Sequence, residues 1–248
     1  MSSDWRIECR DDVRFASSAL LSSIPTIRHG FGLRYGGASA HVALARALGQ
    51  TEPPVTLNQV HGSRLLHLRG SAQEATPPEA DGSYAAAAAL QGRPLAIKTA
   101  DCVPLLLASS DGRFVAAVHA GWRGTAASIS VEALRAFEER GGSAGELRVA
   151  IGPAIGRCCY QVDRNVVESV GATLSDANAV AKPDGKAFRI DLQLANQLQL
   201  ERAGLHSTQI SVAPWCTHCS EGDFHSYRRE GDRAGRQWSL IGGNPSAA

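Results

Sequence analysis

Two short apolar segments on either side of a turn sequence constrain the fold of this chain most strongly. Residues 103–108 and 113–118 are largely apolar, and residues 109–112 between them read Ser-Ser-Asp-Gly. Apolar runs of this length, bounded by turn-forming residues, are typical of buried strands. The pattern therefore predicts a β-hairpin in the core of the protein.

Other segments predict further strands together with helices. The helix expected at residues 126–140 has Thr125 as its N-cap, carries apolar residues at helical spacing, and ends at Gly141 and Gly142. The other predicted elements are strands at residues 94–99, 147–151 and 209–212, helices at 163–170 and 191–203, loops at 71–80 and 181–186, and an ordered loop region at 214–235. Hairpins mixed with helices favour an α+β fold over a regular βαβ alternation. Because no repeat or linker interrupts the pattern, we expect one domain over residues 1–248.

Composition and charge argue against several classes of protein. The 248 residues include 25 basic and 24 acidic ones and give a net charge of +1, whereas nucleic-acid-binding proteins usually carry a strong basic excess. No apolar run approaches the roughly 18 residues of a membrane span, and the charged N-terminal segment does not resemble a secretory signal. We therefore expect a cytoplasmic protein with neither nucleic acid nor membrane as a partner. In that reducing compartment, the six cysteines indicate metal binding or catalysis rather than disulfides.

The predicted hairpin brings Cys102 and His119 close together. If residues 109–112 form a four-residue loop, Cys102 stands directly opposite His119, with Cβ atoms about 4.5–5.5 Å apart. A two-residue loop at Asp111 and Gly112 would shift the register by about two residues and keep the same neighbourhood.

A cysteine that faces a histidine has three interpretations. The pair can be the nucleophile and base of a thiol hydrolase. It can supply two ligands of a zinc ion, with His61 as the third ligand and an open fourth position, which is the ligand count of a catalytic zinc site. It can also be a buried cysteine beside a hydrogen-bonded core histidine. Spacing alone leaves all three open.

The other cysteine-rich segments carry weaker signals. Residues 216–219 read Cys-Thr-His-Cys, which lacks the second pair that a structural zinc site uses and the βαβ context of a thioredoxin-type site. Cys158 and Cys159 are adjacent, and neighbouring side chains on a strand point to opposite faces, so we interpret them as packing residues.

Two glycine-rich segments each combine an arginine with backbone amides. Arg34 lies in residues 29–37, and Arg228 lies in residues 226–231. A guanidinium beside backbone N–H groups suits an anion, so both arginines are candidates for an anion clamp. Neither segment matches a P-loop or a dinucleotide-binding motif.

Six motifs in order along the chain resemble those of one family. They are Asn-Gln-Val-His-Gly at 58–62, Ala-Asp-Gly at 80–82, Thr-Ala-Asp-Cys-Val-Pro at 99–104, Val-His-Ala-Gly-Trp-Arg-Gly at 118–124, Ile-Gly-Pro-Ala-Ile-Gly at 151–156 and Phe-His-Ser-Tyr-Arg-Arg at 224–229. Together they resemble the laccase-domain family, also called multicopper polyphenol oxidoreductases and peptidoglycan editing factors. The resemblance covers residues 29 to about 241.

The resemblance implies a fold, a metal site and an activity. The implied fold is α+β, with mixed β-sheets packed together and flanked by helices, similar to a bacterial cytotoxic necrotizing factor. The implied zinc ligands are His61, Cys102 and His119. The implied activity is phosphorolysis of adenosine, inosine, guanosine and methylthioadenosine, with phosphate as co-substrate, and deamination of adenosine. Copper is the alternative metal, but a blue-copper centre uses an axial ligand such as Met, and Met1 is the only methionine.

The same motifs supply candidate catalytic and substrate-binding residues. Cys102 is a candidate catalytic residue as well as a metal ligand. Asp81 and Asp101 are the two motif carboxylates that could move a proton when a zinc-activated water attacks the purine ring. The candidate substrate-binding residues are Arg34, Gln59, Arg123 and Arg228.

The chain departs from the family in two places, and rival functions stay open. Residues 38–56 lack the Ser-Leu-Asn-Leu-Gly stretch of the family, and His225 stands where the family commonly has Phe. The rivals are a metal-free Cys-His hydrolase acting on amide bonds in wall peptides, a non-catalytic cell-wall editing factor that partners a ligase, and a copper-dependent polyphenol oxidase.

Overall fold

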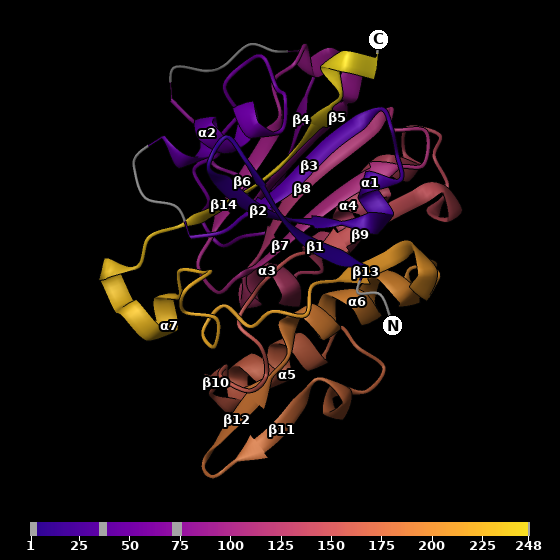
Figure 1. Ribbon diagram of the computed structural model, residues 1–248. Coiled ribbons are helices and arrows are strands. Elements are labelled where there is room, and N and C mark those ends of the chain that lie inside the picture. Colours follow the sequence, from indigo (N-terminus) through magenta and orange to yellow (C-terminus); the bar gives the residue numbers. More distant parts are fainter. Residues whose placement is uncertain (1–3, 35–38, 71–75, 248) are drawn as a thin grey trace.

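The computed structural model describes residues 4–34, 39–70 and 76–247, and two large β-sheets packed against each other form its centre (Figure 1). The first sheet has five antiparallel strands in the order β1-β2-β3-β14-β6. Their bounds are Trp5–Arg10 (β1), Val13–Ser18 (β2), Ile27–Gly32 (β3), Gln237–Gly243 (β14) and Leu95–Thr99 (β6).

The second sheet has six strands in the order β13-β9-β7-β8-β5-β4. Their bounds are Ile210–Val212 (β13), Leu147–Ile151 (β9), Val103–Ser109 (β7), Phe114–Ala120 (β8), Gly82–Ala86 (β5) and Leu65–Leu68 (β4). The two outer pairs, β13 with β9 and β4 with β5, are parallel, and the other pairs are antiparallel. The sheet is therefore mixed, as the resemblance implied.

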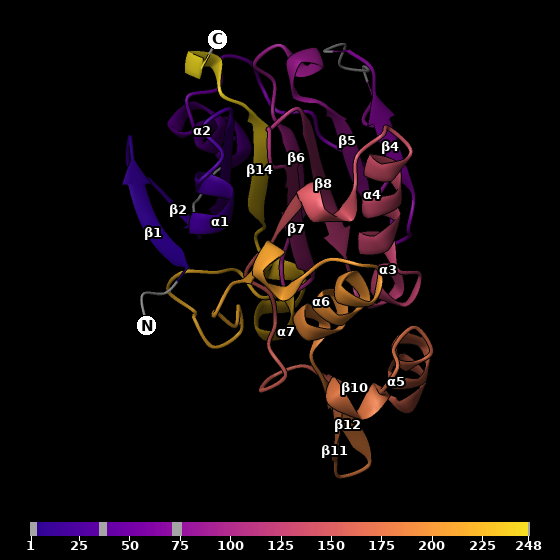
Figure 2. The ribbon, with the colours of Figure 1, turned by 90° about the vertical axis from the view of Figure 1, so that its right-hand side faces the viewer.

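Helices cover the outer faces of both sheets, and a small third sheet lies at one end. The α-helices of the described residues are Ala19–Ser22 (α1), Ala40–Ala47 (α2), Trp122–Ala126 (α3), Ile129–Glu138 (α4), Arg164–Gly171 (α5), Leu192–Arg202 (α6) and Tyr227–Glu230 (α7). Strands Gln161–Val162 (β10), Ala187–Ile190 (β12) and Ala181–Asp184 (β11) form the third sheet. Short 3-10 helices span Ala87–Leu90, Ala144–Glu146, Ala177–Ala179, Ser207–Gln209, Gly231–Arg233 and Pro245–Ala247. In Figure 2, α4 lies on the opposite side of the strands from α2 and β1, and α5 lies beside the third sheet at the lower end.

The burial of the hairpin strands explains this layered arrangement. Leu105 and Leu107 of β7 pack with the apolar residues of α4 and α6, whereas Leu106 and Ala108 face the five-stranded sheet. Because successive side chains of a strand point to opposite faces, an all-apolar strand must be covered on both sides. The predicted apolar hairpin is confirmed at β7 and β8, and the α+β fold class is confirmed.

Two predictions of local structure were wrong. The helix expected over residues 126–140 is two helices, α3 and α4, because Ser128 adopts a left-handed conformation (φ 56°) between them, and Thr125 lies inside α3 instead of capping it. The loop expected at residues 181–186 belongs to the β11–β12 hairpin, in which Gly185 turns the chain at φ 63°. Residues 71–75 of the other predicted loop lie outside the described residues.

The helices of the described residues are all too short or too polar to cross a membrane.

Candidate functional site

A pocket of about 840 Å³ opens where β6, β7 and β8 end or begin at one edge of the two sheets. Its lining comes from the loop before β4, the end of β6 and the β6–β7 connection, the end of β8, the segment between β9 and β10, the start of α6 and the C-terminal region. The lining residues are Gln59, His61, Lys98, Thr99, Ala100, Asp101, Cys102, His119, Ile155, Tyr160, Leu192, Tyr227, Arg228, Ala234 and Arg236.

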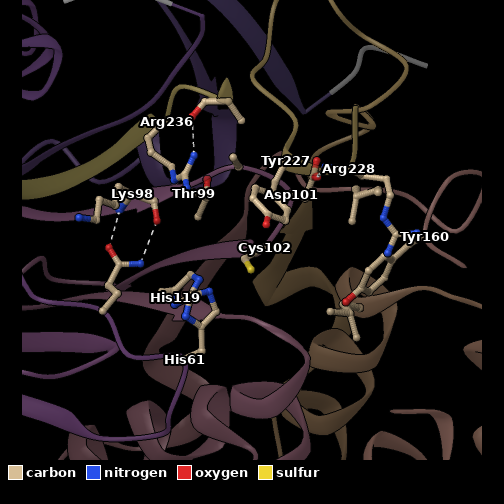
Figure 3. A pocket seen from close by; sticks show the side chains of 15 residues that line it. His61, Lys98, Thr99, Asp101, Cys102, His119, Tyr160, Tyr227, Arg228 and Arg236 are labelled. Carbon is tan, nitrogen blue, oxygen red and sulfur yellow. Dashed lines mark hydrogen bonds between the residues drawn. The ribbon is translucent and has the colours of Figure 1, made fainter. Parts of the chain in front are cut away.

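Three potential metal ligands converge at the base of this pocket. His61 lies in the loop before β4, Cys102 directly precedes β7, and His119 lies near the end of β8. One ligand atom from each residue lies within 4.8 Å of the other two. The two imidazole rings are 4.9 Å apart between centroids at 84°, and Cys102 lies near both rings (Figure 3). The predicted set of three residues therefore meets at one place.

The expected register of the hairpin needs a correction. Pro104, and not Cys102, pairs with His119, so the strands follow the two-residue-loop alternative. Cys102 still reaches His119 because the chain leaves the sheet before Val103, where Asp101 adopts a left-handed conformation (φ 86°). A non-glycine residue stays in that region only when the surrounding structure holds it there, and the hydrogen bonds that the Asp101 carboxylate accepts from Thr217, Ser226 and Arg228 do so.

The buried carboxylate of Asp81 organises both histidines. One oxygen accepts a hydrogen bond from the backbone N–H of His61 (2.8 Å) and lies 2.9 Å from Nδ1 of His119, and the other accepts from the N–H of Gly62 (2.6 Å). The contact with Nδ1 leaves Nε2 of His119 for a metal ion, as carboxylate partners of metal-bound histidines do. His61 is held at φ 61° by the same contacts.

Gly121 leaves space directly beneath the three ligands. A Cβ atom at this position would lie 3.3 Å from Cys102 Sγ and 3.3 Å from Cδ2 of His61. A side chain there would push against two of the three ligands, so the absence of a Cβ is part of the site. The donor set of one sulfur and two imidazoles, with no fourth described protein ligand in the group, fits a catalytic metal ion with an open position.

The electrostatics of the ligands favour a thiolate. Burial would raise the pKa of Cys102, but hydrogen bonds and charges from His119 and His61 lower it to about 6. Burial would lower the pKa of His119, but contacts with Asp81 and Cys102 raise it to about 9. Without a metal, the Cys102 thiolate therefore faces a protonated His119 at neutral pH. A metal cation can replace one proton of that imidazole.

The second predicted carboxylate, Asp101, lies at the pocket wall and is fully engaged. It accepts hydrogen bonds from Thr217 Oγ1 (2.6 Å), Ser226 Oγ (3.0 Å) and the backbone N–H of Arg228 (2.7 Å). These contacts join the β6–β7 connection to the C-terminal region. Asp101 therefore holds the C-terminal region against the β6–β7 connection, and we call this set of hydrogen bonds the Asp101 clamp.

The predicted substrate-binding residues divide into two groups. Gln59 and Arg228 line the pocket; the Gln59 amide bonds the backbone N–H and C=O of Lys98. Arg34 and Arg123 do not line it: Arg34 pairs with Glu230, and the Arg123 guanidinium lies over the ring of Trp122.

Among the lining residues that sequence analysis did not single out are four cationic or tyrosine side chains. Lys98 and Arg236 lie on one side of the pocket, and Tyr160 lies near Arg228 on the other (Figure 3). Tyr227 adds a half-exposed ring. Two of them carried a signal, since Lys98 is the one charged side chain in the apolar run at residues 94–99 and Tyr227 lies in the motif at 224–229.

Fold and site together define an α+β protein with a candidate Cys-His-His metal centre at the base of a pocket. The chain belongs to the family described as multi-copper polyphenol oxidoreductase laccase, whose model matches residues 32–244.

Similar proteins include named enzymes. The chain is 37% identical over 198 residues to "Purine nucleoside phosphorylase YlmD" of Geobacillus stearothermophilus, covering 76% of this chain and 71% of the relative. It is 32% identical over 209 residues to "Adenosine deaminase RL5" of an unknown prokaryotic organism, covering 82% and 80%. The crystal structure of YlmD from Geobacillus stearothermophilus superposes with a TM-score of 0.85 at 29% identity, covering 98% of this chain and 99% of that one. The predicted family is confirmed, and so is the prediction that the chain is an enzyme.

Proposed function

We propose that the chain is a zinc-dependent purine nucleoside phosphorylase that also deaminates adenosine. One observation carries the proposal: His61, Cys102 and His119 converge at the base of a pocket whose walls hold cationic and aromatic side chains. The names of the relatives support the same two reactions. The donor set favours zinc over copper because the three donors match a catalytic zinc site, and Met1, the only methionine of the sequence, is a poor candidate for the axial ligand of a blue-copper centre.

Two features of the pocket support phosphate and nucleoside as substrates. Lys98, Arg228 and Arg236 provide three cations for a phosphate. Tyr160 and Tyr227 provide flat apolar faces for a purine. Burial raises the pKa of Tyr160 to about 12, so its hydroxyl stays protonated and can donate a hydrogen bond to a ring nitrogen of the base.

The bound zinc, Asp81 and Asp101 would each have a separate role in the reaction. Bound zinc would lower the pKa of a coordinated water and polarise substrate oxygen atoms. Asp81 keeps the proton of His119 at Nδ1 and fixes the backbone of His61. Asp101 holds the backbone N–H of Arg228 and thus positions one wall cation. We therefore propose that Asp81 and Asp101 position other residues.

Nucleoside turnover by the zinc-loaded protein tests the proposal. Adenosine, inosine, guanosine and methylthioadenosine are incubated with and without phosphate, and the products are separated by chromatography. We expect free base only when phosphate is present, and inosine from adenosine. Cys102→Ala should abolish both reactions, whereas Cys9→Ser, on the exposed edge strand β1, should retain them. Absence of turnover for all four nucleosides by zinc-loaded protein would contradict the proposal.

One observation favours a second candidate, a thiol hydrolase. Cys102 and His119 lie within contact distance, and the lowered pKa of Cys102 is typical of an activated nucleophile. Iodoacetamide separates the two candidates, because bound zinc should protect Cys102 from alkylation. Amide-bond hydrolysis that survives chelation and is lost on alkylation would favour the hydrolase.

Oxygen uptake with a phenol after copper loading would instead favour a polyphenol oxidase.

A further inference from the structure

We propose that Cys158, Cys159, Cys216 and Cys219 form a second metal site, a structural zinc centre held by four thiolates. One sulfur atom from each of the four residues lies within 4.8 Å of the others. This group is separate from His61, Cys102 and His119, and the proposal does not depend on the nucleoside chemistry of the pocket.

The structure overturns the interpretation of Cys158 and Cys159 as packing residues. They do not lie on a strand, where adjacent side chains would diverge. The N–H groups of Cys159 and Tyr160 both donate to the carbonyl of Gly156, at 2.9 and 3.0 Å, so the chain forms a tight turn. The turn aims both cysteines at the C-x-x-C segment and supplies the second pair that it lacks in sequence.

The sulfur distances suit a single ion better than a disulfide. Cys219 Sγ lies 3.7 Å from Cys158 Sγ and 3.3 Å from Cys159 Sγ. A disulfide bond is about 2.05 Å long, whereas a tetrahedral ion with Zn–S bonds of about 2.3 Å separates its sulfur ligands by about 3.8 Å. Sulfurs gathered this closely leave no room for the multi-atom core of an iron–sulfur cluster. The backbone N–H of Gly156 also donates to Cys216 Sγ at 3.2 Å, which stabilises a thiolate.

The position of the cluster gives it a structural task. Cys159 directly precedes Tyr160 of the pocket wall. Cys216 directly precedes Thr217, which donates to Asp101. An ion at the cluster would therefore tie the turn that carries Tyr160 to the segment that the Asp101 clamp holds. Four protein ligands leave no open position, so the site would not bind substrate.

Metal content measured on three variants tests the proposal. Wild type, Cys102→Ala and Cys158→Ser/Cys219→Ser are purified with zinc under reducing, anaerobic conditions, and Cys9→Ser is the matched control because this exposed cysteine lies in neither cluster. We expect two zinc ions per chain for wild type and Cys9→Ser, and one for each of the other variants. Two zinc ions in Cys158→Ser/Cys219→Ser would overturn the proposal.

X-ray absorption of zinc-loaded Cys102→Ala supplies the second measurement, which needs no change in the cluster. We expect four sulfur neighbours at about 2.3 Å. Nitrogen neighbours, absence of zinc, or a mapped disulfide between any two of the four cysteines would overturn the proposal. Because none of these readouts involves turnover, a failed nucleoside assay would leave them unaffected.

Discussion

Asp81 is the residue on which both histidines of the site depend. Its carboxylate is completely buried and contacts Nδ1 of His119 and the backbone N–H groups of His61 and Gly62. Burial would raise the pKa of Asp81, but these hydrogen bonds lower it. A charged, hydrogen-bonded Asp81 fixes the ring of His119 and leaves its Nε2 free for the proposed metal ion.

Asp81→Asn should weaken zinc binding by about 10–100-fold, because it keeps the shape of the side chain but removes the charge that holds His119. Competition with a chromophoric chelator measures the affinity, and circular dichroism checks the fold. An unchanged zinc affinity in a folded Asp81→Asn protein would show that Asp81 does not support the metal ligands.

Gly121→Ala should also weaken zinc binding, because the new methyl group would lie 3.3 Å from both Cys102 Sγ and His61 Cδ2. We expect a loss of about tenfold or more, on the scale found for residues that support metal ligands. Gly70→Ala is the matched control, since its Cβ would meet nothing within 4 Å. Equal zinc affinities of the two variants in the chelator competition would contradict the close packing beneath the site.

At the scale of secondary-structure elements, the Asp101 clamp joins the β6–β7 connection to the start of α7. The hydroxyl of Ser226 makes two hydrogen bonds at this junction. It donates to Asp101, and as the N-cap of α7 it accepts from the backbone N–H of Arg229. Ser226→Ala should therefore lower the free energy of unfolding by about 1.5–3 kcal/mol, the range for a hydrogen bond to a charged group. Urea denaturation measures this loss, with the exposed Ser110→Ala as the control. A loss no larger than that of the control would mean that Asp101 does not hold this segment.

The β2–β3 pair contains an acid-sensitive contact. Nε2 of His29 accepts a hydrogen bond from the N–H of Ser18 at 3.0 Å, and burial lowers the pKa of His29 to about 4. The unfolded chain binds a proton at this histidine below about pH 6.5, whereas the folded chain does so only below about pH 4. Stability from this group is therefore present above pH 6.5 and is lost as the pH falls toward 4, by about 3 kcal/mol in total.

His29→Gln should flatten the fall in unfolding free energy between pH 6.5 and 4, because glutamine accepts the same bond without titrating. Urea denaturation at several pH values measures the slope. The exposed His206→Gln should keep the slope of wild type. A His29→Gln slope as steep as that of wild type would place the acid sensitivity elsewhere.

Local patterns in the sequence predicted the central elements β6–β9, α4–α6 and β13, but not the strands before β6, the last strand β14 or the exact joins between elements. The apolar runs located β7, β8 and β9, because strands buried on both faces contain few polar residues. The same runs could not set the register of Cys102 against His119, which depends on how Asp111 and Gly112 close the turn. Ser128 likewise gave no sign in the sequence that it would interrupt a helix, although it adopts a left-handed conformation between α3 and α4.

The meeting of the three candidate metal ligands could be predicted because Cys102 and His119 stand at the ends of predicted strands and His61 lies in one of the motifs. The walls of the pocket could not, because they combine segments far apart in the chain. Arg34 and Arg228 looked equivalent in sequence, yet the fold turns Arg34 to Glu230 and leaves Arg228 at the pocket. The cluster of four cysteines was missed because only the tertiary structure brings Cys158 beside Cys219.

At the scale of the whole molecule, the two packed sheets anchor one side of the pocket in the core, and the other side is built from segments outside the sheets. The strand ends that carry Cys102 and His119 are anchored in a core buried on both faces, whereas the opposite pocket wall comes from loops and the C-terminal region. A candidate metal centre facing a wall held by the Asp101 clamp is an arrangement that can bind a substrate between them.

An anomalous difference map at the zinc absorption edge, from crystals grown with zinc, tests the central claim most directly. We predict a peak bonded to His61, Cys102 and His119, with the fourth position facing the pocket. The absence of a peak among these three side chains, or a fourth protein ligand on the ion, would contradict the account.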